Sequence, residues 1–217
     1  MRSRHKPAQA PIKPAPNAGL MLFVGDSLAS DWARLVLAEK DVDGAQVRFI
    51  KPGAAVDEDF LVLNPALSLP TLADREGVIA GARVIVEYID ERYPHPPLMP
   101  QAPAGRARVR MALHSLEHEL FPLVEALEGE VRRAMEGARS ELLQRLQAGG
   151  RHFAAQGYIL GRDYTLVDCG WGALLHRLQQ RGVELPEQAQ ALRQYAARLS
   201  ARPAYRRCYE VAPRRSR

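Results

Sequence analysis

The sequence predicts a chain in two parts, an α/β half followed by a half made of helices alone. Between residues 20 and 92, short apolar runs and amphipathic segments follow one another in the order βαβαββα. From Ala104 onward the sequence has no strand pattern and reads as helices separated by glycines. A proline-rich run at residues 93–100 lies between the two parts. We therefore expect two packed domains of different class within 217 residues.

The first part opens with a strand at residues 20–24, which ends in a Gly-Asp turn. A helix is expected to follow from a cap at Ser30 or Asp31, because apolar residues then recur at helical spacing. Residues 46–50 alternate like a second strand. A strand, a helix and a strand in this order favour a parallel pair joined by a right-handed crossover.

A hairpin and a helix complete the first part. The Asn64-Pro65 pair ends a short helix, and residues 69–73 then read as a strand. Pro70, near the start of that strand, suits an edge position or a cis peptide. Residues 78–80 pair with the strand across a four-residue turn. The helix that follows is expected to bury a stripe made of Val84, Ile85, Tyr88 and Ile89.

The clearest helix start in the second part is at Thr165. Its hydroxyl can accept a backbone amide of the first turn, and the carboxylate of Asp168 can accept the amide of Thr165 in return. We expect the threonine to contribute about 1 kcal/mol of stability and to have no catalytic part. Helix breaks are expected at Gly137, Gly149, Gly150, Gly161, Gly182 and Pro186.

The net charge of +5 belongs to the two ends of the chain. Residues 1–20 carry four basic residues and no acid, and residues 201–217 carry six arginines and one glutamate, which leaves −4 for residues 21–200. We expect a disordered, proline- and alanine-rich basic tail at residues 1–19 and a second basic tail at residues 212–217. Such tails suit non-specific contact with DNA, although solvated termini explain them equally well.

Composition argues against several classes of protein. No window approaches the roughly 20 apolar residues of a membrane helix, and the first twenty residues lack the apolar core of a signal peptide. We therefore expect a cytoplasmic protein with no membrane partner. The two cysteines, Cys169 and Cys208, have neither disulfide-framework nor zinc-ligand spacing, so we expect reduced thiols.

Residues 93–100 contain four prolines around a single imidazole, that of His95. Each proline fixes φ at roughly −65° and pushes the preceding residue toward extended geometry. His95, between Pro94 and Pro96, therefore has few conformations to lose on binding. This preorganisation suits a docking surface, but on physical grounds alone an interdomain linker explains the prolines better.

A longer pattern around this run resembles the stringent starvation protein A family, bacterial regulators associated with RNA polymerase and built on a glutathione transferase fold. The pattern is EYIDERYPHPPLMP at residues 87–100, of which PHPPLMP is the most family-specific part. Further matching segments are VLAEK at 36–40, LNP at 63–65, PTL at 70–72 and TLVDC at 165–169. The resemblance spans residues 21–211. It implies a thioredoxin-like domain over residues 20–97, a linker over 98–103 and an all-helical domain over 104–211.

The resemblance also implies a function. Proteins of this family act without catalysis, bind RNA polymerase holoenzyme and its sigma factor, and alter promoter use under starvation or acid stress. By resemblance, the partner-binding surface would consist of Tyr93, Pro94, His95, Pro96 and Pro97. A homodimer is expected, and no cofactor. The basic tails depart from the family's usual length. Separately, Gly81-Ala82 and several substitutions in the helical half indicate a divergent member or paralogue, whose partner could differ.

An enzymatic alternative is a glutathione transferase-like reaction that uses Ser27. In the transferase fold a Ser, Cys or Tyr after the first strand activates the thiol, and Ser27 takes that position when Arg34 is aligned with the arginine of the first helix. The pair of residues that usually holds the γ-glutamyl end of glutathione is Glu/Gln-Ser, but here it is Gly81-Ala82. Neither side chain can hydrogen-bond that charged end, so glutathione chemistry is not expected. Pro70 takes the cis-proline position, which non-catalytic relatives also keep.

Two further kinds of site receive little support. His114 and His118 are four residues apart on a predicted helix, but no third ligand can be named, so surface residues explain them better and no metal is expected. Another alternative to the polymerase regulator is a heterodimer subunit that binds a signal nucleotide at the subunit interface. The sequence contains neither a phosphate loop nor a dinucleotide-binding fingerprint.

Overall fold

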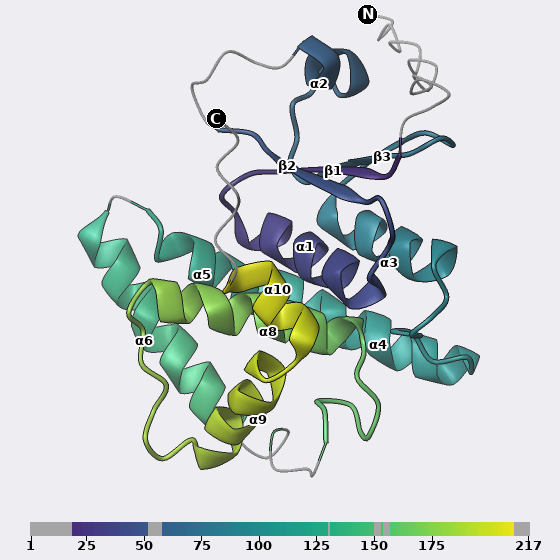
Figure 1. Cartoon of the computed structure of the whole chain (residues 1–217). Helices are drawn as coiled ribbons and strands as arrows, with labels where there is room; N and C mark the ends of the chain where they lie inside the picture. The colour runs from purple at the N-terminus through teal and green to yellow at the C-terminus, as the bar shows by residue number, and fades with distance from the viewer. Residues whose placement is uncertain (1–18, 52–57, 130, 150–152, 154–156, 211–217) are drawn as a thin grey trace, which may run out of the picture.

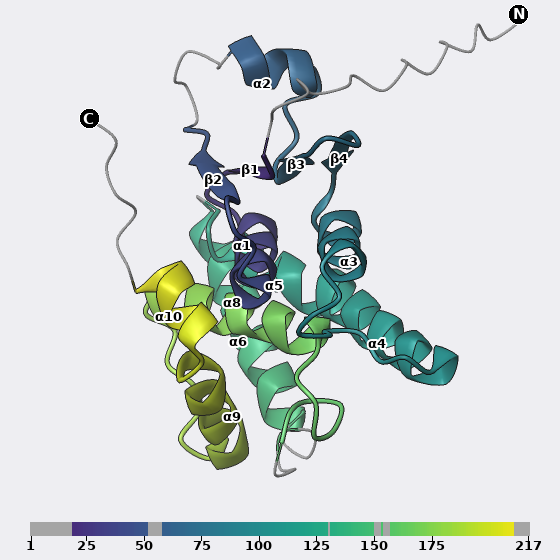
Figure 2. The same cartoon turned by 45° about the vertical axis from the view of Figure 1, so that its right-hand side comes forward.

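The computed structural model describes residues 19–51, 58–129, 131–149, 153 and 157–210. The two basic tails expected at residues 1–19 and 212–217 lie outside these residues, apart from Gly19. Figure 1 shows a sheet with its helices above a larger group of helices, and Figure 2 shows the same arrangement from another side.

A four-stranded sheet organises the first part, in the strand order β2-β1-β3-β4. Its strands are β1 (Met21–Val24), β2 (Gln46–Phe49), β3 (Thr71–Ala73) and β4 (Val78–Ala80). β1 runs parallel to β2 and antiparallel to β3, and β3 forms an antiparallel hairpin with β4. Leu22 of β1 pairs with Val47 on one side and with Leu72 on the other. The crossover and the hairpin are those that the sequence predicts.

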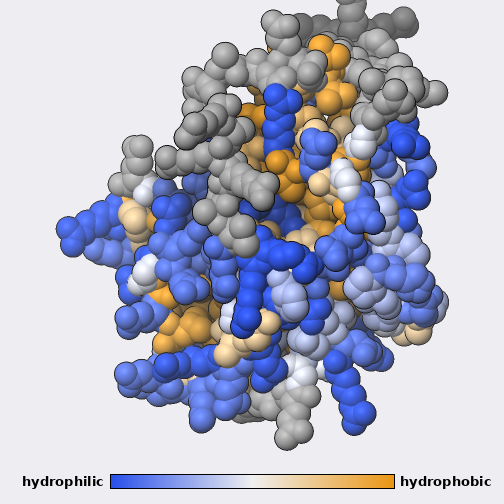
Figure 3. Space-filling model, viewed as in Figure 1, coloured by the Kyte–Doolittle hydropathy of each residue, from blue (hydrophilic) through white to orange (hydrophobic). Residues whose placement is uncertain are grey.

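Helices cover both faces of this sheet. α1 (Leu28–Lys40) and α3 (Ala82–Arg92) pack together between the sheet and the helical half, whereas α2 (Glu58–Leu63) lies on the opposite face (Figures 1 and 2). The predicted βαβαββα order is therefore confirmed. β2 and α2 expose apolar side chains, among them Val47 and Phe49, and orange atoms gather over this part of the molecule in Figure 3.

Two expectations about these helices are wrong in detail. α1 is capped by Ser27, three residues before the expected cap at Ser30, because the Ser27 hydroxyl accepts the amide of Ser30 at 3.2 Å. Ser30 and Asp31 therefore lie inside the helix, where the Asp31 carboxylate accepts Arg177 Nε at 2.5 Å. On α3, Val84 is 59% exposed, and the core side of the helix is formed by its neighbours Ile85 and Val86.

Seven helical segments make up the second part. They are α4 (Pro103–Ser115), the π-helical turn η1 (Leu116–Leu120), α5 (Phe121–Ala126), α6 (Arg132–Ala148), α8 (Leu166–Gln180), α9 (Gln190–Ser200) and α10 (Pro203–Tyr209), counted over the residues that the structure describes. The helix break expected at Gly137 does not occur, because this glycine lies inside α6. None of the helices in the described ranges has the length and apolarity needed to cross a membrane.

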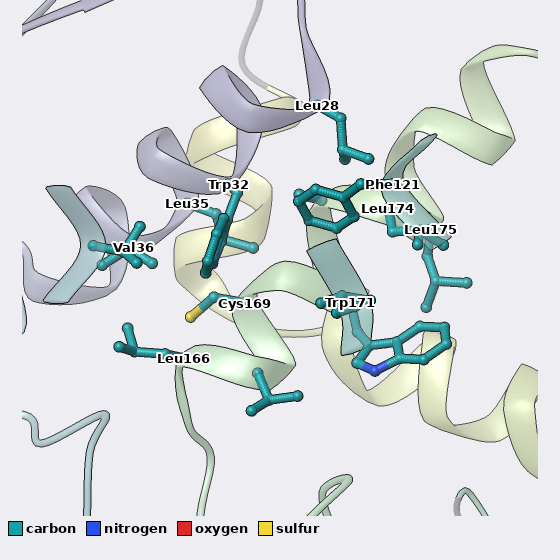
Figure 4. Packing of buried hydrophobic residues seen from close by; sticks show 14 of the residues in the cluster. Leu28, Trp32, Leu35, Val36, Phe121, Leu166, Cys169, Trp171, Leu174 and Leu175 are labelled. Atoms are coloured by element: carbon teal, nitrogen blue, oxygen red, sulfur yellow. The ribbon is translucent and has the colours of Figure 1, made fainter. Parts of the chain in front are cut away.

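α8 joins the two parts into one core. It is buried along most of its length and packs against α1, α4 and α5. Figure 4 shows Trp32 and Leu35 of α1 directed toward this helix, with Phe121 beside them. The rings of Trp32 and Phe121 meet edge to face at 5.8 Å. At Gly170 a Cβ atom would lie 2.5 Å from the side chain of Leu116, so the missing side chain allows the close approach.

The first turn of α8 contains the predicted capping box. The Thr165 hydroxyl accepts the amide of Val167 at 3.3 Å, and the Asp168 carboxylate accepts the amide of Thr165 at 2.8 Å. Asp168 also accepts Tyr195 Oη at 2.7 Å and the amide of Ile159 at 2.9 Å. One buried carboxylate thus satisfies donors from three parts of the helical half.

Candidate functional site: an exposed proline segment over a buried ion pair

Residues 93–100 separate into an exposed stretch and a buried anchor. Pro94, His95, Pro96 and Pro97 are exposed, and Tyr93 is half-buried. Directly after them, Leu98 and Met99 are 2% and 6% exposed and belong to the core. The residues expected as a linker, 98–103, therefore include two core side chains, and α4 already begins at Pro103.

The segment bends where an extended course is expected. The His95–Pro96 peptide is cis, as is the Leu69–Pro70 peptide before β3. The restriction that prolines place on a chain does not by itself select this isomer, because the trans preference of an X-Pro bond is small. The carbonyl of Pro96 faces the end of α1, where it accepts Lys40 Nζ.

Lys40 and Asp90 lie directly beneath this bend. Lys40 Nζ donates to Asp90 Oδ1 at 2.5 Å and to the carbonyl of Pro96 at 2.6 Å. The same oxygen of Asp90 accepts the amide of Leu98 at 2.8 Å. The side chain of Lys40 is 0% exposed and that of Asp90 is 7% exposed. Sequence reasoning missed both residues. They are fifty positions apart in the chain, and only the packing of α1 against α3 brings them together.

The residues of the alternative, enzymatic site also converge, at one end of the sheet. A Cβ atom at Gly25 would lie 3.0 Å from the side chain of Leu69, and the amide of Gly81 donates to the carbonyl of Pro70 at 3.4 Å. The turn after β1, the cis-proline turn and the start of α3 therefore meet, as the transferase-like expectation requires. Ser27 lies in the first of these turns.

That end of the sheet lacks the side chains that a transferase reaction needs. Ser27 Oγ accepts the amide of Ser30 at 3.2 Å and donates to Ser30 Oγ at 3.0 Å, so its hydroxyl is used within the cap. α3 starts at Gly81 without a side-chain cap, which leaves no carboxylate or hydroxyl at the position of the γ-glutamyl contacts. No histidine or carboxylate bonds Ser27 within the described ranges. The turn can bond a ligand through its backbone groups, but it offers no activated nucleophile.

Neither cysteine of the chain offers a reactive thiolate in place of the Ser27 hydroxyl. Both Cys169 and Cys208 are buried and free. Burial raises the pKa of Cys208 to about 12 and raises the pKa of Cys169 well above its usual value. A thiol that stays protonated at neutral pH is a poor nucleophile and a poor metal ligand.

The histidine pair is placed on the surface. The rings of His114 and His118 lie 4.0 Å apart, and His118 Nδ1 lies 2.8 Å from the carbonyl of His114. Glu117, the nearest carboxylate in the sequence, accepts Arg83 Nη1 at 2.8 Å. Within the described part of the chain no group of three His, Cys, Asp or Glu side chains is arranged to hold a metal ion.

Comparison with known proteins identifies both the fold and the family. Residues 25–97 match the family model of the glutathione S-transferase N-terminal domain. A glutathione transferase of Methylococcus capsulatus superposes with a TM-score of 0.78 at 22% identity, over 88% of this chain and 98% of that one. At this identity the likeness shows the fold alone. It confirms a glutathione transferase-like architecture with a thioredoxin-like domain and a helical domain.

The curated relatives are more informative. A stringent starvation protein A homolog of Haemophilus ducreyi is 38% identical over 164 residues, which are 73% of this chain and 74% of the relative. A homolog of the same name from Coxiella burnetii is 39% identical over 162 residues, 74% of this chain and 76% of the relative. This chain belongs to the stringent starvation protein A family. Residues 94–97 of the PHPPLMP run form the exposed stretch above Lys40 and Asp90.

Proposed function

We propose that this chain is a non-catalytic transcription regulator that binds RNA polymerase holoenzyme and its sigma factor in the cytoplasm and alters promoter use under starvation or acid stress. The docking surface is the exposed segment formed by Tyr93, Pro94, His95, Pro96 and Pro97. One observation carries this proposal. Within the PHPPLMP run, residues 94–97 are exposed to solvent, whereas Leu98 and Met99 are buried and anchor the run in the core.

Exposed prolines contribute little stability through burial, and here they present a preorganised surface to solvent. Three prolines hold a rigid, largely apolar surface around one imidazole, and a surface that is ordered before binding loses little entropy when a partner arrives. The area is small for a stable interface, which fits a contact that polymerase completes with further surfaces. The exposed side chain of His95 supplies a polar group at the centre.

The transferase-like end of the sheet supports the non-catalytic assignment. The hydroxyl of Ser27 is used within its own helix cap, and Gly81-Ala82 offer no side chain for a charged ligand. A charge-assisted hydrogen bond to the γ-glutamyl end of glutathione, which Gly81-Ala82 cannot form, contributes about 1.5–3 kcal/mol. Glutathione would therefore bind here with roughly tenfold to a hundredfold lower affinity than in a complete site.

The second element of the proposal is a homodimer. Val84 on α3 and Met111 on α4 are 59% and 71% exposed. Each comes directly after an arginine of the contact between α3 and α4. In this contact Arg83 Nη2 donates to the carbonyl of Arg110 at 3.4 Å. Two large apolar side chains beside an ordered ion network are a suitable centre for contact with a second copy of the chain.

The test of polymerase docking uses the full chain and purified holoenzyme of the host bacterium. The variant Pro94→Ala/His95→Ala/Pro96→Ala should lose at least roughly tenfold in affinity, because it removes both the rigid backbone and the imidazole. A matched variant, Arg132→Ala/Arg133→Ala/Glu136→Ala, changes three exposed residues of α6 and should bind like the wild type. Circular dichroism confirms that both are folded. Holoenzyme bound equally by both variants would refute the docking surface.

The enzymatic alternative is tested in the same preparations. Wild-type protein is incubated with glutathione and a general electrophile, and thiol consumption is followed beside the Ser27→Ala variant. We expect no turnover above the uncatalysed rate in either sample. Turnover that is present in the wild type and absent in Ser27→Ala would overturn the non-catalytic assignment.

A further inference from the structure

We infer that the buried ion pair of Lys40 and Asp90 is the positioning element of the docking surface, which sets the place and orientation of residues 94–97 for the partner. The inference rests on the proposed function, because it assigns two residues to the surface that binds polymerase. Neither residue is exposed, so neither touches the partner itself.

The geometry connects the pair directly to the segment. Lys40 is the last residue of α1 and Asp90 lies in the last turn of α3, two helices that pack against each other. The ammonium donates to the carbonyl of Pro96, and the carboxylate accepts the amide of Leu98. The pair therefore bonds the backbone on both sides of Pro97 from beneath.

The segment has little else to hold it. Among the residues that the structure describes, the bond from Lys40 to Pro96 is the one hydrogen bond that reaches the backbone of residues 94–97. Proline nitrogens cannot donate, so three of these four residues have no amide with which to fix themselves. Their side chains are exposed and contribute little packing. Between Tyr93 and Leu98, which pack on the core, the bond from Lys40 is therefore the direct hydrogen bond that holds this surface.

The pair is better explained by positioning than by stability. Two charges in a low-dielectric interior lose most of their attraction to the cost of desolvation, and an apolar pair of similar volume is often as stable or more so. An apolar pair, however, could not donate to one backbone carbonyl and accept from a nearby amide. That directional requirement is what Lys40 and Asp90 meet.

The decisive variant replaces the pair with apolar residues, as Lys40→Met/Asp90→Leu. Its matched control is Glu39→Leu/Arg202→Met, which removes a neighbouring ion pair between α1 and Arg202, at 2.7 Å, whose hydrogen bonds in the described ranges go to Tyr158 and not to residues 93–100. Three quantities are measured on each full chain: the affinity for purified holoenzyme, the hydrogen exchange of the Leu98 amide and the unfolding midpoint. A merely structural role would change the midpoint and the affinity together in both variants.

We expect Lys40→Met/Asp90→Leu to stay folded, to exchange the Leu98 amide faster and to lose roughly tenfold or more in holoenzyme affinity. The control should keep its affinity within about threefold and keep Leu98 protected. Unchanged exchange at Leu98, or an equal loss of affinity in both variants, would overturn the positioning role. If the wild type fails to bind holoenzyme, the proposed function falls, and the exchange of Leu98 still decides whether the pair holds the segment.

A conservative variant covers the case in which the apolar pair does not fold. Asp90→Asn keeps an oxygen that can accept both the amide of Leu98 and the ammonium of Lys40. It should therefore retain protection of Leu98 and bind holoenzyme within about threefold of the wild type. A large loss of affinity with Leu98 still protected would show that the carboxylate acts by its charge, and the positioning role would be wrong.

Discussion

His176 shows how a single residue can tie stability to pH in this fold. Its ring stacks on Tyr209 at 3.9 Å, and Nδ1 lies 3.4 Å from the hydroxyl of Tyr205. Burial, aided by the charges of Arg34 and Arg177, lowers the pKa of His176 to about 4. The imidazole is therefore neutral in the folded protein over the whole range in which an unfolded histidine takes up a proton.

This shift predicts a loss of stability in acid. Above the unfolded pKa of about 6.5 both states are neutral, and between 6.5 and 4 the unfolded state binds the extra proton, so the free energy of unfolding falls as the pH falls. Allowing for partial exposure, the loss is roughly 1 kcal/mol. His176→Phe keeps the stack and removes the titration, so its unfolding free energy should vary less between pH 7 and pH 4. Parallel pH curves for the two proteins would contradict this.

At the scale of elements, the turn before α8 depends on a glycine that the sequence does not single out. The amide of Tyr158 donates to the carbonyl of Gly161 at 2.7 Å, and the amide of Ile159 then reaches Asp168. At Gly157 a Cβ atom would lie 2.3 Å from the carbonyl oxygen of Gly161. Backbone cannot yield as a side chain can, so this position admits glycine alone without a shift of the turn.

Gly157→Ala should therefore reduce the free energy of unfolding by roughly 1–3 kcal/mol, because the turn must open and release the amide that Asp168 accepts. Gly137→Ala is the matched control. Nothing lies within 4 Å of its Cβ position, and the residue is in the middle of α6, so alanine should stabilise by about 0.5–1 kcal/mol. Chemical denaturation measures both changes. Equal stabilities for the two variants would contradict the role of the turn.

The elements of the fold show where sequence reasoning succeeds and where it fails. The capping box at Thr165 could be predicted because its partners are three residues apart, and the Leu69–Pro70 turn because proline acts locally. Gly137 reads as a helix break, yet α6 continues through it, because one glycine costs a helix only about 1 kcal/mol. The predicted start of α1 is wrong because Ser27, Ser30 and Asp31 are all residue types that cap helices, and it is the Ser27 hydroxyl that accepts the amide of Ser30. The bond of Asp31 to Arg177, 146 positions away, is a partner that a local pattern does not contain.

At the scale of the whole molecule, the fold is a transferase-like frame in which α3 begins without a side-chain cap and residues 94–97, between the two parts, are exposed. The proposed dimer places Val84 and Met111 against a second copy. Sequence reasoning placed Val84 in the core, because an apolar stripe does not show whether a helix is covered by its own chain or by another.

We expect sedimentation velocity of the wild type to give twice the 24.1 kDa mass of the chain. Val84→Lys/Met111→Lys should sediment as a monomer, since two charges would have to be buried at the interface. Val131→Lys alters an exposed apolar residue of the helical half, 65% exposed, and should leave the dimer intact. A dimer that persists in the double variant would show that another face joins the subunits.

The exposed residues of the proposed docking surface stand out in the sequence, whereas the residues at its base do not. The run of prolines around His95 stands out because proline and histidine are locally informative. Lys40 and Asp90 do not stand out, because a lysine and an aspartate on amphipathic helices usually face solvent. Their burial, and the cis peptide at Pro96, appear when α1, α3 and the segment are packed together.

The most direct test of the account places a photoreactive benzoylphenylalanine at position 95 of the full chain, in complex with purified RNA polymerase holoenzyme. A second protein carries the same group at position 131, on the helical half and away from the proline segment. The account predicts a crosslink to a polymerase subunit or to sigma factor from position 95 and none from position 131. A complex that forms but crosslinks from position 131 alone would contradict the central claim that the proline segment is the docking surface.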